Sequence, residues 1–314
     1  MSEVKEIKQS INKVQIIGAI SEINLEYDPN IVNKNNPKLK GAIVKKEFKN
    51  PSVTIESNGQ VYGVDFFPTY ENKEDDNGKI ISNPRFKALE TIMNYDKGTR
   101  VKADCSLSEN GYANDQGEYK SFTQVNCFQM SSSGVPEEDA SDGRISGIIR
   151  TIKDEIRNEE ETGRVLVEFY TFTNQGATVP FNIVVDTDLA DDFKDMYEQG
   201  DSCSLDFELV MKQVGGKRKS KNHFGRRESK VVDGFEIMEI NLIGGDEAFD
   251  EENQYYIDTD TIKKALNERK IMIDQKIADK KEKGASKSTE KKGLGKKSSV
   301  DTSEGTSSDS ECPF

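Results

Sequence analysis

The sequence contains no tryptophan and one histidine, His223, which leaves little support for a histidine metal site or for histidine-based catalysis. Its four cysteines are Cys105, Cys127, Cys203 and Cys312; they form no CxxC pair, and no zinc ligand set is recognisable. Cys105 and Cys203 fall on inward positions of expected strands, where cysteine acts as a small hydrophobic residue. This cysteine usage indicates a reducing cytoplasm.

Long apolar runs are also lacking. No stretch approaches the length of a membrane span, and the N-terminal MSEVKEIKQS has no apolar signal region. The sequence shows no phosphate-binding glycine loop, no nucleophile motif and no carboxylate pair with a catalytic spacing. We therefore expect a soluble, unexported protein with no membrane partner, no metal or other cofactor, and no enzymatic activity.

The overall composition is polar. Of the 314 residues, 33% are hydrophobic and 32% are charged, and the mean hydropathy is −0.74. Such an average is too polar for one large core, so part of the chain is expected to be disordered. The length leaves room for two domains of ordinary size and a tail.

Short runs of alternating apolar and polar residues fill the first part of the chain, which is typical of β-strands. Asn58-Gly59 joins two of these runs and is the strongest short signal for a hairpin, because both turn residues need positive φ. Asn83 and Pro84 open a helix. The residues from 24 to 51 are expected to be irregular. Strands are predicted at 11–23, 53–57, 60–67, 101–107 and 122–130, with the helix between the third and the fourth.

The same order recurs in the second part, with strands predicted at 144–152, 164–172, 178–185, 203–211 and 234–243. Asp186 or Thr187 is expected to cap a helix between the third and fourth of these strands. In each half a glycine, Gly98 or Gly200, is expected to end the helix. Five short strands with one helix in this place describe an oligonucleotide-binding (OB) barrel, a five-stranded Greek-key fold. The repeat predicts a mainly β protein with two tandem OB barrels, and two unrelated small β domains are the alternative.

Composition also sets the expected boundaries. SSSGVPEEDASD separates the two repeats, an acidic stretch follows Gly244-Gly245, and a helix is expected at 259–280. Beyond it the residues are almost all polar and cannot form a core. The predicted organisation is a first OB domain at 1–134, a linker at 135–142, a second OB domain at 143–248, an acidic linker and helix at 249–283, and a disordered tail at 284–314.

Positive charge is concentrated in two expected loops, although the net charge of the chain is −13. One follows the first strand of the first barrel, and the other, at 212–230, joins the last two strands of the second barrel. Such loops border the ligand of an OB barrel, and basic residues there neutralise phosphates without reading sequence. A solvated hairpin tip is the alternative for the second loop. The predicted phosphate ligands are Lys34, Lys38, Lys40, Lys45, Lys46, Lys49, Lys212, Lys217, Arg218, Lys219, Lys221, Arg226, Arg227 and Lys230.

Single-stranded nucleic acid also needs exposed aromatic side chains on which its bases stack. Alternation leaves Phe67 on the outer face of the first hairpin, and in the second barrel it points Tyr170 and Phe172 away from the core. Tyr112 lies in the expected loop between the last two strands of the first barrel, and Phe224 lies among the arginines of the second basic loop. These five are the predicted stacking residues; ordinary packing is the alternative for each.

Several segments resemble bacterial and phage single-stranded DNA-binding proteins. NKVQIIGAISEI resembles their opening strand, VDFF their third strand, and YANDQGEYKSFTQVNC the tip and return of the loop between strands four and five. The resemblance implies stacking roles for Phe67 and Tyr112, in agreement with the alternation. Two barrels in one chain, in place of the usual one per subunit, imply a phage protein in the cytoplasm of a bacterial host, as a monomer or homodimer.

The C-terminal DSECPF is similar to the tails of that family, which end in acidic residues and Pro-Phe. The resemblance implies that Asp309, Glu311, Pro313 and Phe314 recruit replication, recombination or repair proteins. The predicted function is therefore sequence-independent binding and protection of single-stranded DNA. The alternatives are an RNA-binding OB protein, and a scaffold that binds proteins and no nucleic acid.

Overall fold

The computed structural model describes residues 8–28, 46–157, 159–214 and 235–290. Two compact units are distinguished: Met1–Gly111 with Ser121–Ile271, and Tyr112–Lys120 with Met272–Phe314. The first unit contains most of the strands. The described part of the second consists of one hairpin tip and more than half of the last helix.

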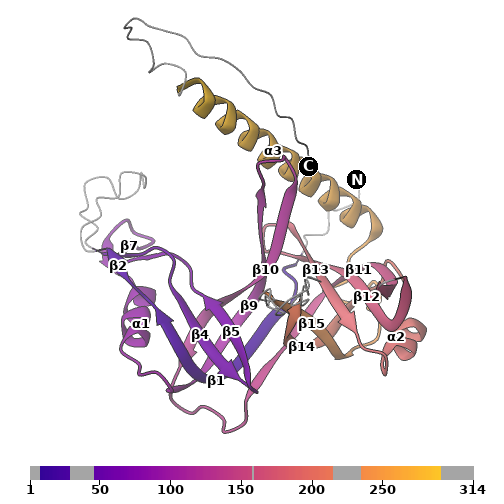
Figure 1. Cartoon of the computed structure of the whole chain (residues 1–314), viewed down its shortest axis with the longest axis horizontal. Coiled ribbons are helices and arrows are strands. Elements are labelled where there is room, and N and C mark those ends of the chain that lie inside the picture. The colour runs from indigo at the N-terminus through magenta and orange to yellow at the C-terminus, as the bar shows by residue number, and fades with distance from the viewer. Residues whose placement is uncertain (1–7, 29–45, 158, 215–234, 291–314) are drawn as a thin grey trace, which may run out of the picture. The chain divides into compact units, whose positions relative to one another are not determined.

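Five strands of the N-terminal half pair in a closed ring, which we call the N-terminal ring (Figure 1). Its members are β1 (Asn12–Asn24), β4 (Ser52–Ser57), β5 (Gln60–Asp65), β9 (Arg100–Ala113) and β10 (Tyr119–Ser131). β1 pairs with β4 and β9, β4 pairs with β5, and these pairs are antiparallel. β5 runs parallel to β10, which lies beside β9 and closes the ring.

The C-terminal ring repeats this scheme of pairing. Its strands are β11 (Ala140–Arg157), β12 (Glu160–Phe172), β13 (Thr178–Val185), β14 (Ser202–Val214) and β15 (Phe235–Gly245). β11 pairs with β12 and β14, β12 with β13, and β14 with β15, all antiparallel, whereas β13 and β15 are parallel. This closed five-stranded barrel is consistent with an OB fold. A further antiparallel pair, β1 with β11, joins the two rings in one sheet.

Three helices and two small sheets complete the described fold (Figure 1). The helices are α1 (Pro84–Met93), α2 (Ala190–Met196) and α3 (Thr259–Glu290). None of the helices in the described part of the chain is long and apolar enough to cross a membrane. The small sheets consist of β2 (Tyr27–Asp28), β3 (Glu47–Phe48) and β6 (Thr69–Tyr70), and of β7 (Asn72–Glu74) and β8 (Ile80–Ser82). The stretch from 24 to 51 that we predicted to be irregular therefore contributes two short strands.

The first hairpin forms as predicted. Asn58 and Gly59 adopt φ of 52° and 71°, the conformation of a tight turn between β4 and β5. The turn sets the register, so that Val53 and Tyr62 are buried while Phe67, beyond the end of β5, is exposed. The predicted division between core face and outer face is confirmed.

The first helix is capped as predicted, because the Asn83 side chain accepts a hydrogen bond from the Arg85 amide and Pro84 occupies the first turn. The predicted cap of the second helix is wrong. α2 begins at Ala190 with Leu189 at its N-cap and no side-chain cap. The Asp186 carboxylate is instead paired with Arg164.

The predicted helix ends are also corrected. α1 ends at Met93 and α2 at Met196, a few residues before the glycines that we expected to end them. Gly98 and Gly200 adopt φ of 89° and 104° in the turns that lead into the next strands. Positive φ, which glycine tolerates best, is used there to reverse the chain and not to end a helix.

One further glycine in each ring shows how closely the rings agree. A Cβ on Gly18 of β1 would collide with the carbonyl oxygen of Glu56 in the neighbouring β4. A Cβ on Gly147 of β11 would collide in the same way with the carbonyl of Tyr170 in β12. The first strand of each ring therefore needs glycine where it passes against the second strand.

Candidate nucleic-acid interface

Two exposed phenylalanines lie side by side on the outer face of the N-terminal ring. Asp65 pairs with Asn126 in the parallel ladder, and Phe67 and Phe128 each stand two residues further along their strands. Their ring centroids are 6.1 Å apart at 31°, and the two residues are 44% and 57% exposed. Exposed neighbouring rings of this kind offer flat apolar surfaces to a planar ligand.

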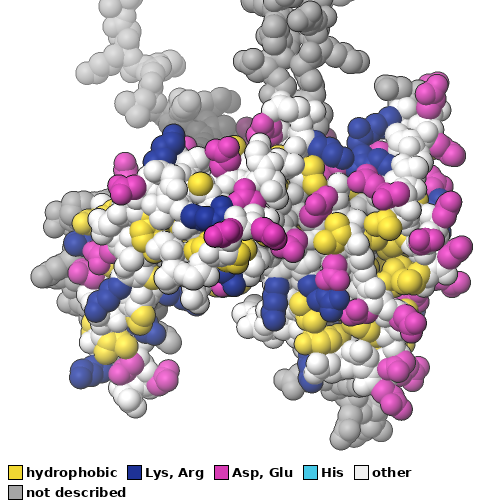
Figure 2. Space-filling view, turned by 90° about the horizontal axis from the view of Figure 1, so that it is seen from below, with side chains coloured by type: hydrophobic (Ala, Val, Ile, Leu, Met, Phe, Trp, Pro, Cys, Tyr) yellow, Lys and Arg dark blue, Asp and Glu magenta, His cyan; other side chains and the backbone are white. Residues whose placement is uncertain are grey.

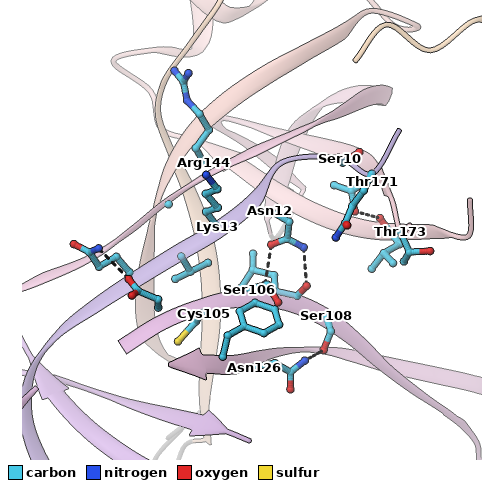
Figure 3. A pocket seen from close by; sticks show the side chains of 18 of the residues that line it. Ser10, Asn12, Lys13, Cys105, Ser106, Ser108, Asn126, Arg144, Thr171 and Thr173 are labelled. Carbon is cyan, nitrogen blue, oxygen red and sulfur yellow. Dashed lines mark hydrogen bonds between the residues drawn. The ribbon is translucent and has the colours of Figure 1, made fainter. Parts of the chain in front are cut away.

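A groove of about 1260 Å³ begins at this aromatic pair and runs along β1 and β9. Amides and hydroxyls line its floor (Figure 3). The Asn12 side chain donates to the Leu107 carbonyl at 2.8 Å and accepts from the Leu107 amide at 2.9 Å. The Asn126 amide donates to Ser108 Oγ at 2.5 Å. These bonds hold the asparagines in place, and groups of this type can meet the edges of bases.

Charge in the groove is mixed. Among the described lining residues, the cations are Lys13 and Arg144, and they lie with the carboxylates of Asp104, Asp142 and Asp206. Arg144 donates to both carboxylate oxygens of Asp206, at 2.7 and 2.9 Å. That hydrogen bonding holds the pKa of Asp206 below its usual value. The groove walls therefore bring no surplus of positive charge, and Figure 2 shows acidic and basic side chains interspersed on the face that it displays.

Comparisons with known proteins place the chain in a family. Residues 10–283 match the model of the YorF family.

The chain belongs to the YorF family.

No curated protein matches its sequence. Solved structures that match this chain include the wild-type single-stranded DNA binding protein from Thermus aquaticus, at 12% identity, with 78% of this chain and 97% of that one covered and a TM-score of 0.44. A deletion mutant of the same protein gives 12% identity, 78% and 98% coverage and a TM-score of 0.45. A replication protein A heterotrimer bound to single-stranded DNA gives 11% identity, 77% and 51% coverage and a TM-score of 0.17. Likeness at this level supports no conclusion about what this chain binds.

Tyr170 and Phe172 of this YorF-family chain correct our expectation of exposed stacking residues. They point away from the barrel core, but they are only 8% and 2% exposed. Ile257, Ile262 and Ala265, at and before the start of α3, pack over them in a small separate apolar cluster. A segment far along the sequence therefore covers the outer face of β12, and bases cannot reach these rings in this arrangement.

The other predicted stacking residues are in different situations. Phe67 is exposed as predicted, beside the groove. Tyr112 is exposed but belongs to the second unit. Phe224 lies outside the described residues.

Three predicted phosphate ligands lie within the described residues. Lys46 pairs with Glu90 at 3.6 Å, and its ammonium lies 4.6 Å from the centroid of the Tyr27 ring. Lys49 is exposed. Lys212 pairs with Glu239 at 2.6 Å, so its charge is already partly neutralised. The predicted phosphate ligands outside the described residues are Lys34, Lys38, Lys40, Lys45, Lys217, Arg218, Lys219, Lys221, Arg226, Arg227 and Lys230, and the predicted partner-binding residues Asp309, Glu311, Pro313 and Phe314 lie outside them as well.

Two exposed aromatics of the YorF-family chain were missed from the sequence, Phe122 and Phe128 on β10. The signal was present, because Val125 and Cys127 are buried and alternation from either one points both phenylalanines outward.

Among the described residues, no group of three or more histidine, cysteine or acidic side chains is placed so that it could hold a metal ion. Burial raises the pKa of the Cys203 thiol, and Cys105, hydrogen-bonded to Cys127 and buried, is likewise held protonated by a raised pKa. Thiols in this state are poor nucleophiles and poor metal ligands.

Proposed function

We propose that this chain binds single-stranded DNA without sequence preference, and that its main site is the groove beside Phe67 and Phe128. The observation that carries the proposal is this pair of adjacent, exposed phenyl rings at the mouth of a groove lined with amides and hydroxyls. Stacking of a base on an aromatic ring contributes about 1–3 kcal/mol and suits every base, because each has a π-face.

The position of the pair supports this proposal. Large apolar rings exposed to water gain free energy when a planar partner covers them. The pair sits on the third and fifth strands of its ring, next to the face on which OB barrels hold oligonucleotides. Asn126 and Ser108 lie on the adjoining strands, where their polar groups can meet base edges.

Positive charge would come from the basic loops. Lys46 and Lys49 flank β3, whose Phe48 pairs with Thr69 of β6, and β6 begins two residues after Phe67 in the sequence. The segment that precedes them, 29–45, carries four lysines and no acidic residue. Lysines near the stacking pair would neutralise phosphates while reading no sequence.

We further infer that the two rings are tandem OB barrels, each with one helix between its third and fourth strands. The pairings of the rings agree strand for strand, including the one parallel pair in each. α1 precedes β9 and α2 precedes β14, so each helix comes directly before the fourth strand. Agreement at this level supports duplication of a single fold.

Fluorescence anisotropy tests the proposed function. The wild-type chain would be titrated into a labelled dT oligomer of about 35 bases, longer than one OB site. We expect binding that resists competition by duplex of equal length. The logarithm of the affinity should fall with that of the salt concentration at about −0.7 per phosphate neutralised. Oligo-rU serves as a second competitor.

Variants locate the site in the same assay. Phe67→Ala and Phe128→Ala should each weaken binding by about 5-fold to 100-fold, which corresponds to about 1–3 kcal/mol. Ile156→Ala and Met196→Ala, at exposed apolar positions of the C-terminal half, serve as matched controls and should bind as wild type does. Equal affinity for duplex, stronger binding of rU, or no binding at moderate salt would each contradict the proposal, the last in favour of a protein scaffold.

A further inference from the structure

The outer face of β10 continues beyond the aromatic pair. Phe122, Gln124, Asn126 and Phe128 occupy alternate positions of β10, and Val125 and Cys127 between them are buried, so all four side chains lie on one face of the strand. Phe122 is 53% exposed. At about 3.3 Å per residue, it lies roughly 20 Å from Phe128 along the strand. The face therefore has an aromatic ring at each end and two amides between them.

A second groove, of about 620 Å³, contains Phe122. One wall comes from β5 and β10, and the other from Met211 of β14 and Met238 of β15. Gly63 lies on the floor, and a Cβ added there would meet no atom within 4 Å. Open backbone beside an aromatic ring and two methionines leaves room for a flat apolar group.

Hydrogen bonds between the rings fix the walls of this second groove. The buried Tyr62 hydroxyl donates to the Leu209 carbonyl at 2.7 Å. The Met211 amide donates to Gln60 Oε1 at 2.6 Å. Because β5 is tied to β14 at two points, the groove is present before any ligand arrives.

Acidic groups in the groove favour a base over a phosphate. Asp65 accepts a hydrogen bond from Gln124 at 2.7 Å, and Glu236 accepts one from Gln213 at 2.5 Å. A phosphate between these carboxylates would be repelled, whereas an uncharged base stacked on Phe122 would not. We therefore expect the phosphates to lie outside this groove.

Basic residues adjoin, in the sequence, strands near this face. Val214 and Phe235 end the strands that line the second groove, and residues 215–234 between them carry seven lysines and arginines against two acidic residues. Lys46 and Lys49 flank β3, which is attached through β6 beside Phe67. In the sequence, a basic segment therefore joins the two strands, β14 and β15, that border the second groove.

We infer that a single strand follows the outer face of β10, from the Phe67–Phe128 pair across Gln124 to a second stacking position on Phe122 in the groove between the rings. This inference rests on the proposed function and extends its site. The two stacking positions are about six nucleotides apart at the 3.4 Å spacing of a stacked strand, and fewer in an extended one.

The absence of tryptophan makes a direct test possible. Phe122→Trp places the only tryptophan of the chain in the second groove, and stacking of a base on it should quench its fluorescence. Ile156→Trp is the matched control at an exposed position outside both grooves. Each would be titrated with dT oligomers of increasing length, while anisotropy reports total binding.

We expect anisotropy to show binding before quenching appears, because short oligomers occupy the Phe67–Phe128 pair first. Quenching of Phe122→Trp should then set in with oligomers that span both positions, whereas Ile156→Trp should stay unquenched at every length. Phe122→Ala should bind short oligomers as wild type does and lose about 5-fold to 100-fold for long ones. Phe122→Tyr should restore that loss, and Gly63→Glu, which places bulk and charge on the path, should reproduce it.

The outcomes separate the inference from the proposed function. If wild type binds long oligomers but Phe122→Trp is never quenched, or Phe122→Ala binds every length normally, the path along β10 is wrong and the proposed function stands. If wild type fails to bind the long oligomer, both are wrong.

Discussion

The two rings share one scheme of strand pairing and differ in what they carry on the outside. Two residues beyond the parallel ladder, the N-terminal ring has Phe67 and Phe128, which are exposed and adjacent. Two residues beyond the corresponding ladder, the C-terminal ring has Asp186 and Ile243. The same backbone position therefore holds an aromatic pair in one ring and an acidic and an aliphatic residue in the other.

In the C-terminal ring, Asp186 at this position belongs to a network of ion pairs. Arg164 lies 2.9 Å from Asp186, 2.7 Å from Glu239 and 3.3 Å from Glu155, and Lys212 also reaches Glu239. Every one of these side chains is engaged with its neighbours, so this surface resembles a structural ion-pair network more than a ligand site.

The outer faces of the two rings also differ in how they are covered. Tyr170 and Phe172 of β12 are covered by the start of α3, whereas no described segment covers Phe67 in the N-terminal ring. Two rings with the same strand pairing can therefore carry different residues on their outer faces. One ring can keep exposed aromatic residues on its outer face while the other uses that face to hold a helix.

The largest expected effect tests this difference directly. Phe172→Ala should reduce the free energy of unfolding by about 3–5 kcal/mol, because it opens a cavity under α3. Phe67→Ala should change it by no more than about 0.5 kcal/mol, because its ring is exposed. Urea unfolding measures both, and limited proteolysis between 257 and 271 reports release of the helix. A Phe172→Ala variant as stable as wild type would show that packing of the start of α3 on Phe172 does not stabilise the fold.

The second prediction concerns the ion-pair network of the C-terminal ring. Arg164→Ala leaves Glu155 and Glu239 close together without their shared, nearly buried partner, and should destabilise the chain by about 3 kcal/mol. Arg157→Ala is the matched control, since Arg157 binds the same Glu155 from an exposed position and should cost less than about 1 kcal/mol. Equal losses in urea unfolding would mean that burial of Arg164 does not matter.

The third prediction follows from the pKa values of this network. Burial alone would raise the pKa of Glu239, but hydrogen bonds from Lys212 and Arg164 outweigh it and leave the pKa below the usual 4.5. A lowered folded-state pKa adds stability above 4.5 that is lost as the pH falls through the folded-state value. Unfolding measured from pH 6 to pH 3 should therefore show a loss below about 4.5, and Arg164→Gln should make that loss shallower. A pH dependence identical in both proteins would exclude the network as its source.

The smallest expected effect concerns the turn of the first hairpin in the N-terminal ring. Gly59→Ala forces a side chain to adopt φ of 71° and should cost about 1 kcal/mol in urea unfolding. Gly244→Ala provides the control, because its φ is not positive and an added Cβ meets no atom within 4 Å. A neutral Gly59→Ala variant would show that the turn relaxes without disturbing the register.

The N-terminal ring was largely predictable because its signals are local. Asn58-Gly59 sets the register of its own hairpin, and the register decides which of Tyr62 and Phe67 faces the core. Asn83 and Pro84 likewise act on the turn of helix that they begin. In the C-terminal ring the same logic failed for Asp186, whose carboxylate is drawn to Arg164, a partner from another strand.

What the sequence by itself determined is the order of the main strands and the side of a strand on which a residue such as Tyr62 or Phe67 lies, since the period of a strand is a property of neighbouring residues. Only the tertiary structure decided which outward residues meet solvent. Ile262 lies about ninety positions after Phe172 and covers it, and Phe128 stands beside Phe67 only because β5 and β10 run parallel in one register. Contacts between distant segments depend on how the strands pair to close the ring. Alternation along a single strand does not predict that pairing, so it does not predict these contacts.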